Sequence, residues 1–188
     1  SFVRTRQSLL TASVGHPGLM QRRFGQAGGI TVSPQTDGIA LQFAQSTANL
    51  SAAGAAANTL AQTHPEKDRF NAWIEGTARL HALNDAGVDH WGSFALLSAG
   101  ADYLVSDTLL AGFAVHADWL NDITNVGSIN GTGFLVGPYL SAELIEGLFL
   151  DASLLYGRTG NDVESNGFTG EFDTSRVLVD ARLSGLVH

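Results

Sequence analysis

Residues 70–83 read FNAWIEGTARLHAL, and this stretch decides the fold. Every second position carries a small or apolar side chain, and mostly polar or larger side chains stand between them. Successive side chains of a β-strand point to opposite faces, so a period of two predicts a strand with two different faces. The apolar face would carry Phe70, Ala72, Ile74, Gly76, Ala78, Leu80 and Ala82. The other face would carry Asn71, Trp73, Glu75, Thr77, Arg79 and His81.

The same alternation recurs in five later segments, at residues 92–105, 109–120, 133–145, 148–159 and 174–186. Strands of soluble domains usually have ~5 to 6 residues, whereas these segments are about twice as long. A tilted strand needs ~9 to 11 residues to cross a membrane. The pattern therefore predicts an all-β fold, an antiparallel transmembrane β-barrel of which six strands are present. A soluble β-sandwich also alternates, and it is the competing interpretation.

The expected connections between these segments alternate in length. Those at 106–108 and 146–147 are tight, whereas 84–90, 121–131 and 160–173 are long and rich in Asn, Asp and Gly. Outer-membrane barrels have short periplasmic turns and longer external loops, so the first strand is expected to run outward. Aromatic residues near the strand ends would form an interfacial girdle. They are Phe70, Tyr103, Trp119, Phe134 and Tyr156.

The face opposite the apolar one carries charges of both signs. Such a face suits a water-lined interior, where charges remain solvated or paired. We expect the following polar residues to line the lumen: Glu75, Arg79, Asp102, His116, Asp118, Glu143, Asp151, Arg176, Asp180 and Arg182. His116 and Asp118 share a strand face, as two ligands of one metal ion would, but the spacing identifies no third ligand. Paired carboxylates in the lumen could serve cleavage of a preceding domain or simply provide polarity.

Composition excludes several functions. The net charge of −8 argues against a nucleic-acid partner, and the absence of cysteine excludes thiolate chemistry. No apolar run approaches the ~18 to 20 residues of a membrane helix. The sequence contains no nucleophile elbow, phosphate loop or zinc-protease motif. We therefore expect no enzyme, no cofactor and no metal site.

Residues 1–69 differ from residues 70–188, and we expect them to form a linker and helical segment leading into the barrel. Residues 4–24 are basic and amphipathic, and a short β-like segment with a turn at 33–38 follows. Residues 44–62 contain the run SAAGAAA, which favours a helix. This helix is either a solvated linker or a thin helix that threads a narrow barrel. Pro65 favours its end at His64.

Several motifs resemble the β-domain of autotransporters, which belong to type V secretion. They are FNAWIEG at 70–76, GADYLVSDTLLAG at 100–112, GPY at 137–139, LFLDASLLYGRTGND at 148–162 and FDTSR at 172–176. The resemblance implies a 12-stranded barrel in the bacterial outer membrane, with residues 44–62 as the helix inside it. It also implies export of an N-terminal passenger in cis, contact with outer-membrane lipid and with the barrel-insertion machinery, and no cofactor.

The chain departs from that family's pattern at three points. Six strands are half of the expected number, and the final residues Leu186 to His188 do not close a strand on an aromatic residue. Asn49 and Asn58 stand alone, whereas one self-cleaving subgroup has an Asn-Asn pair. The missing strands would follow in a longer chain, belong to another chain, or come from a second copy.

Three functions remain open on the sequence. The first is a translocator and membrane anchor for a displayed passenger. The second is a stand-alone porin or structural outer-membrane barrel without a passenger. The third is a soluble β-sandwich that acts as a binding module.

Overall fold

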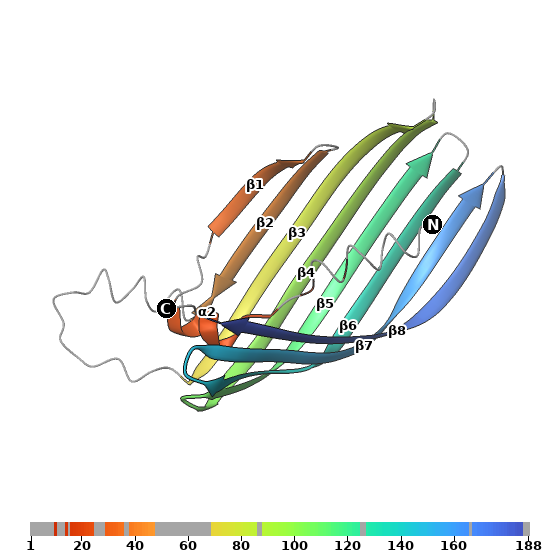
Figure 1. Cartoon of the computed structure of the whole chain (residues 1–188). Coiled ribbons are helices and arrows are strands. Elements are labelled where there is room, and N and C mark those ends of the chain that lie inside the picture. The colour runs from red at the N-terminus through yellow and green to blue at the C-terminus, as the bar shows by residue number, and fades with distance from the viewer. Residues whose placement is uncertain are drawn as a thin grey trace.

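The described residues form one antiparallel sheet of eight strands in chain order, with the short helix α2 beside it (Figure 1). The computed structural model describes residues 10, 14, 16–24, 29–35, 38–47, 69–85, 88–124, 127–165 and 167–185. The elements are α2 (Leu19–Phe24), β1 (Gly29–Gln35), β2 (Gly38–Ser46), β3 (Phe70–Asp85), β4 (Val88–Ser106), β5 (Leu109–Thr124), β6 (Gly127–Ile145), β7 (Leu148–Ser165) and β8 (Phe168–Gly185). The expected all-β, antiparallel fold is confirmed.

The count of six strands was wrong, because β1 and β2 extend the sheet before β3. β2 pairs antiparallel with β3 from Gly38↔His81 to Ser46↔Trp73. Both strands lie within residues 1–69, which we had expected to be a linker and helical segment with one short β-like stretch and a turn at 33–38. The β-like stretch is confirmed as the β1–β2 hairpin, whereas its pairing with β3 was not foreseen. Ala44 and the two residues after it belong to strand β2, and residues 48–62 of the expected helix lie outside the described residues. In the sequence, Pro34 leaves only a short run of alternating apolar and polar residues, so this stretch was not counted among the strands of the sheet. Proline is nevertheless tolerated on an edge strand, which is where β1 lies.

The three long loops were also wrong, because β3 to β8 continue almost to the ends of their hairpins. β3 ends at Asp85 and β4 begins at Val88, and the β5–β6 and β7–β8 connections are equally short. The polar residues of these regions are paired across strands, as Asn121 is with Asn130. The Asn121 side-chain amide donates to the Asn130 side-chain oxygen, which supports the ladder where strand propensity is low.

The two tight turns were predicted correctly, at Asp107–Thr108 and Glu146–Gly147. Gly147 has a φ of 79°, a conformation that favours glycine. Its N–H donates to Glu143 Oε1 at 3.1 Å, which links the turn to the end of β6.

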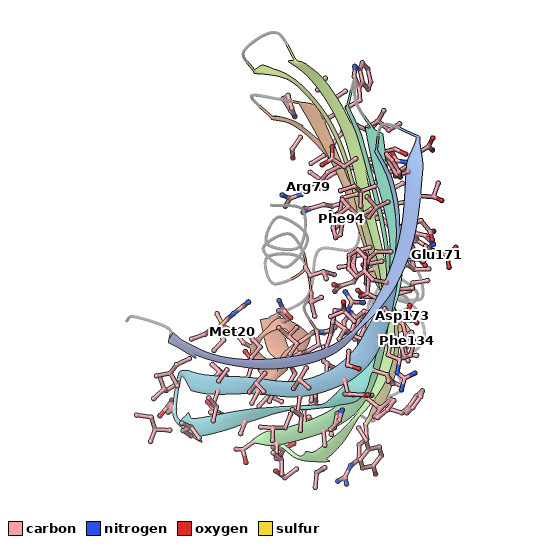
Figure 2. The ribbon with its side chains drawn as sticks, turned by 90° about the vertical axis from the view of Figure 1, so that its right-hand side faces the viewer. Met20, Arg79, Phe94, Phe134, Glu171 and Asp173 are labelled. Carbon is pink, nitrogen blue, oxygen red and sulfur yellow. The ribbon has the colours of Figure 1, made fainter. Side chains whose placement is uncertain are left out.

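The sheet is strongly curved, with a concave and a convex face (Figure 2). Arg79, Phe94 and Met20 lie on the concave side, whereas Phe134, Glu171 and Asp173 point away from the convex side. Gly137 and Gly157 permit close approach of β6 and β7, because a Cβ at either position would collide with a carbonyl oxygen of the neighbouring strand. Such glycines allow a sheet to bend. β1 and β8 are the two edges, so the described strands do not close into a barrel.

The packed core lies on the concave face, between the sheet and the N-terminal part of the chain. One cluster joins Leu19 to side chains from β3 to β7, namely Trp73, Leu104, Leu110, Ala114, Tyr139 and Phe149. A second cluster joins Leu10 to Phe94, Leu96 and Leu120. We call the described residues between 10 and 24 the docked segment.

Candidate functional site: the two faces of the sheet

All ten polar residues predicted to share a face do lie on the concave face. The strand register fixes this arrangement, because Glu75 is opposite Ser98, Ser98 is opposite His116, and Arg176 is opposite Gly157. The concave face is not uniformly polar, however. Phe94, Leu110, Leu135 and Leu155 are buried there, covered in part by the docked segment.

The convex face is apolar and exposed along most of its height. The five aromatic residues of the expected girdle, Phe70, Tyr103, Trp119, Phe134 and Tyr156, are between 46% and 58% exposed. Between them lie exposed aliphatic side chains, among them Leu97, Val115, Leu140, Leu154 and Val179. β1 and β2 continue this surface with Ile30, Val32, Ile39 and Leu41. Monomeric soluble proteins rarely expose contiguous apolar patches beyond a few hundred Å².

A buried hydrogen-bond network surrounds Asp102 on the concave face. Tyr139 Oη donates to Asp102 Oδ2 at 2.9 Å, and Asn71 Nδ2 donates to the same oxygen at 3.1 Å. Trp73 Nε1 donates to Tyr139 Oη at 2.7 Å. Thr47 Oγ1 extends the network by donating to Asn71 Oδ1 at 3.1 Å. The network therefore joins the end of β2 to β3, β4 and β6 through polar groups that burial would otherwise penalise.

The two aromatic rings of this network cover glycines, and they meet edge to face with 64° between their planes. Trp73 occupies the space that a side chain at Gly100 would fill, and Tyr139 does the same at Gly112. Each ring is directly opposite its glycine in the strand register. Phe43 covers Gly76 in the same way on the convex face. Cross-strand pairs of this kind stabilise sheets and fix their register.

Arg176 crosses the concave face from β8 to β5. Its Nη2 lies 2.7 Å from Asp118 Oδ1, and it also donates to the carbonyl oxygens of Phe134 and Arg158. The path is open because Gly133 has no side chain: a Cβ there would overlap Arg176 Nη2. Asp118 is 1% exposed, so the guanidinium compensates a carboxylate that has lost its water.

The docked segment is attached to the concave face by one apolar and one polar contact at its helix start. Leu19 is 1% exposed and packs against the first cluster. Its N–H donates to Ser141 Oγ on β6 at 2.8 Å. The Gly18 N–H donates to Gln21 Oε1 at 2.8 Å, which caps the first turn of α2. Val14 N–H donates to the Leu10 carbonyl at 2.7 Å, a helical spacing that places both side chains on the second cluster.

A small polar cavity of about 40 Å³ lies beneath this segment. Its lining comes from the segment and from β5 to β8, and it comprises Val14, His16, Gln21, Ala114, His116, Tyr139, Asp151, Ser153, Leu155, Asp180 and Arg182. This volume suits one or two water molecules and excludes an organic substrate. The His16 ring stacks on Tyr139 with centroids 4.3 Å apart and an angle of 22° between planes.

Burial is the main influence on the titration of His16. It lowers the pKa of the imidazole below its usual value, because the charged form loses hydration. Asp151, the Pro17 backbone and Asp180 oppose this shift, and Arg182 adds to it. His16 is therefore neutral at neutral pH.

The structure brings some of the predicted polar residues together and leaves others apart. Asp118 meets Arg176, whereas Asp151, Asp180, Arg182 and His116 meet around the cavity. Glu143 lies at a turn, and Glu75 and Arg79 lie on β3, away from that cavity. His116 Nδ1 is 2.8 Å from Ser98 Oγ, and Asp118 is engaged by Arg176. The described residues contain no group of three potential metal ligands.

Sequence reasoning did not identify Trp73, Tyr139, Ser141 and His16 as parts of this site. Trp73 and Tyr139 were recognisable only as large aromatic residues on the otherwise polar face. The i, i+4 spacing of Leu10 and Val14 was a further indication that the N-terminal segment packs on a surface. His16 and Ser141 carried no such indication.

Comparison with family models, curated proteins and solved structures finds no match to this chain. Within the described residues, no helix has both the length and the apolar character needed to cross a membrane.

Proposed function

We propose that this chain is part of an outer-membrane β-barrel that anchors and exports an N-terminal passenger, as an autotransporter translocator does. The observation that carries the proposal is the arrangement of the two faces. All eight strands carry exposed apolar side chains on the convex face, whereas the charged groups in the middle of the sheet, such as Asp118 and Arg176, lie on the concave face. A protein dissolved in water has the opposite arrangement, and a barrel in lipid has this one.

The height of the apolar surface matches a membrane. On β5 it runs from Leu109 to Trp119, and on β6 from Phe134 to Leu144. Eleven residues tilted by about 45° span roughly 25 Å, the height of the apolar band of outer-membrane barrels. Beyond it, the convex side of β7 and β8 carries Asp162, Glu164, Glu171 and Asp173. These charges favour a position outside the lipid, where the three extended hairpins would project on the external side.

The docked segment supports a translocator over an open porin. It covers the concave face with Leu10, Leu19 and Met20, so the interior of the completed barrel would be occupied rather than open. In this proposal the docked segment is the plug, a role that we had expected for residues 44–62.

Completion of the barrel requires further long strands. β8 is an edge of 18 residues, whereas β1, the other edge, has 7 residues. In lipid each unsatisfied backbone group costs several kcal/mol, so an unpaired edge cannot persist there. A second copy that offered β1 would leave most of β8 unpaired. We therefore favour strands that continue beyond those described.

Membrane insertion is tested with the full-length protein expressed in a Gram-negative host. We expect it in the outer-membrane fraction, with gel mobility that changes on heating. We call the band of exposed apolar side chains on the convex face the apolar belt. Leu154→Arg places a charge within this belt and should reduce insertion, because arginine near the bilayer midplane costs ~2 to 4 kcal/mol. Asp162→Arg, outside the belt on the same strand, is the matched control. A soluble full-length protein, or equal behaviour of the two variants, contradicts the proposal.

Export is tested by fusing a reporter domain before Ser1 of the full-length protein. Surface exposure of the reporter, measured by protease treatment of intact cells, supports the translocator. A reporter that stays in the periplasm while the barrel inserts normally supports the stand-alone barrel instead.

A further inference from the structure

We propose that His16 is a proton-sensitive latch that keeps the docked segment on the concave face when neutral and loosens it when protonated. This inference rests on the proposed function, since it assigns a control to the plug of that barrel. It concerns one side chain, its stacking partner and the cavity beneath it.

The geometry suits a neutral imidazole. His16 stacks on Tyr139, and the Tyr139 hydroxyl is already engaged by Trp73 and Asp102. The Tyr139 ring is therefore fixed by groups on other strands and offers a rigid surface for the imidazole. The contact joins the docked segment to the Asp102 network, which includes groups from β3, β4 and β6.

The cavity beneath His16 makes protonation of its imidazole unfavourable while the segment is docked. His16 Nδ1 and Asp151 Oδ1 are both shielded from solvent and have no hydrogen-bond partner within the part of the chain that the structure describes. Gly18 lies directly against the Asp151 carboxylate, so a side chain at position 18 would collide with it. A proton added to His16 thus enters a space of about 40 Å³, which has room for only one or two water molecules to solvate the charge.

Charged and titratable groups from every neighbouring strand face this space. They are His116 on β5, Tyr139 on β6, Asp151 on β7, and Asp180 and Arg182 on β8. The two carboxylates favour the protonated imidazole and Arg182 disfavours it, but burial is the largest influence and lowers the pKa of His16. The undocked segment, exposed to water, has the ordinary histidine pKa of about 6.5.

The sign of the effect follows from these two pKa values. Protons bind more tightly to the undocked form, so docking is strongest above about pH 6.5. It weakens as the pH falls from there toward the lower pKa of the docked form, and the loss is complete below it. Each unit of difference between the two pKa values changes the docking equilibrium about tenfold.

The latch is tested by distance measurement in the full-length protein. The 188 residues contain no cysteine, so Phe24→Cys, at the last residue of α2, and Glu146→Cys place one spin label on the docked segment and one on the β6–β7 turn. Pulsed electron paramagnetic resonance then reports the distance between them. We expect one narrow distance at pH 7.5 and a second, broad population at pH 5.0. His16→Phe keeps an aromatic ring on Tyr139 but binds no proton, so its distance should change with pH much less than in the parent protein.

Two further variants give opposite expectations. Asp151→Asn removes a carboxylate that raises the pKa of His16, so acid should undock a larger fraction than in the parent protein. Arg182→Gln removes a charge that lowers this pKa, so acid should undock a smaller fraction. If His16→Phe does not dock at any pH, the opposite shifts expected of Asp151→Asn and Arg182→Gln still test whether protonation of His16 loosens the segment.

Three results would overturn the latch: an unchanged pH response in His16→Phe, no response in the parent protein, or shifts of the same sign in Asp151→Asn and Arg182→Gln. Heat-modifiable mobility of each labelled protein is measured in parallel. A protein that does not insert contradicts the proposed function, whereas an inserted protein whose distances ignore pH contradicts the latch alone.

Discussion

Because Gly133 has no side chain, it leaves the space that the Arg176–Asp118 ion pair needs on the concave face. The guanidinium of Arg176 lies where a Cβ at position 133 would stand, and this position lets it reach Asp118. Because Asp118 is buried, loss of the guanidinium would leave an uncompensated carboxylate. Removing one partner of such a buried pair costs about 3 to 5 kcal/mol, which is the upper limit for any change that displaces the guanidinium.

We therefore predict that Gly133→Ala destabilises the protein by less than complete loss of the pair would, because the end of the arginine side chain can shift away from the new Cβ. The change would appear as a lower midpoint in urea unfolding of the full-length protein in detergent. Gly170→Ala is the matched control, because a Cβ at position 170 meets no atom within 4 Å. If both variants unfold at the same urea concentration, Arg176 does not depend on the space at Gly133.

The alternation of side chains predicted the face on which each polar residue lies, but not its contacts. The period of two places Asp118 and Arg176 on one face regardless of their distance. Their contact depends on the register of β5 to β8 and on a glycine between them, and neither follows from the pattern of one strand. The same holds for Tyr139, whose hydroxyl meets groups from β3 and β4.

The strands were the most predictable parts of the chain, and the segments before them were the least. From Phe70 onward the alternation is long enough to identify each strand. The strand ends are rich in Asn and Asp, which have low strand propensity, so these ends were predicted as loops. Helix propensity favoured a helix at residues 44–62, but Ala44 to Ser46 belong to β2, and residues 48–62 lie outside the described residues. The segment that packs on the concave face among the described residues comes earlier, between residues 10 and 24. Propensity measures the ease of forming a helix, whereas docking depends on a matching apolar surface. That surface exists only after β3 to β7 have paired.

Leu19 is the point at which we expect the docked segment to be most sensitive. Leu19→Ala should leave a cavity among Leu110, Tyr139 and Phe149, and such losses cost about 2 to 5 kcal/mol. Because the strands keep their own ladders, we expect the segment to loosen without loss of the sheet. Channel recordings in planar bilayers should then show more frequent open events than in the parent protein.

Leu144→Ala provides the control for that measurement. Leu144 is exposed on the convex face and does not contact the docked segment. Its replacement should leave the open probability unchanged. Equal open probability in Leu19→Ala and the parent protein would show that the segment does not obstruct the pore.

The curvature and the edges of the sheet together determine what the complete protein needs. Eight strands curve around the docked segment. β8 pairs with β7 on one side, but its other side, 18 residues long, is paired with no described strand. About half of its backbone groups face the open side, and in the proposed membrane setting neither lipid nor the shorter β1 could satisfy them. An antiparallel strand of similar length, with apolar residues at alternate positions, is the structure that fits beside Val177, Val179 and Leu183.

Hydrogen exchange of the full-length protein in detergent or lipid tests this requirement directly. If a further strand pairs along β8, amides between residues 168 and 185 should exchange as slowly as those of β7, which has neighbours on both sides. Protection should extend through Val177 to Leu183, the part of β8 that lies within the apolar belt. Exchange there would be fast if β8 were a true edge, because half of its amides would lack an acceptor. Fast exchange confined to residues 168–172 agrees with closure, because those residues lie beyond the belt, whereas fast exchange at Val177 to Leu183 excludes it.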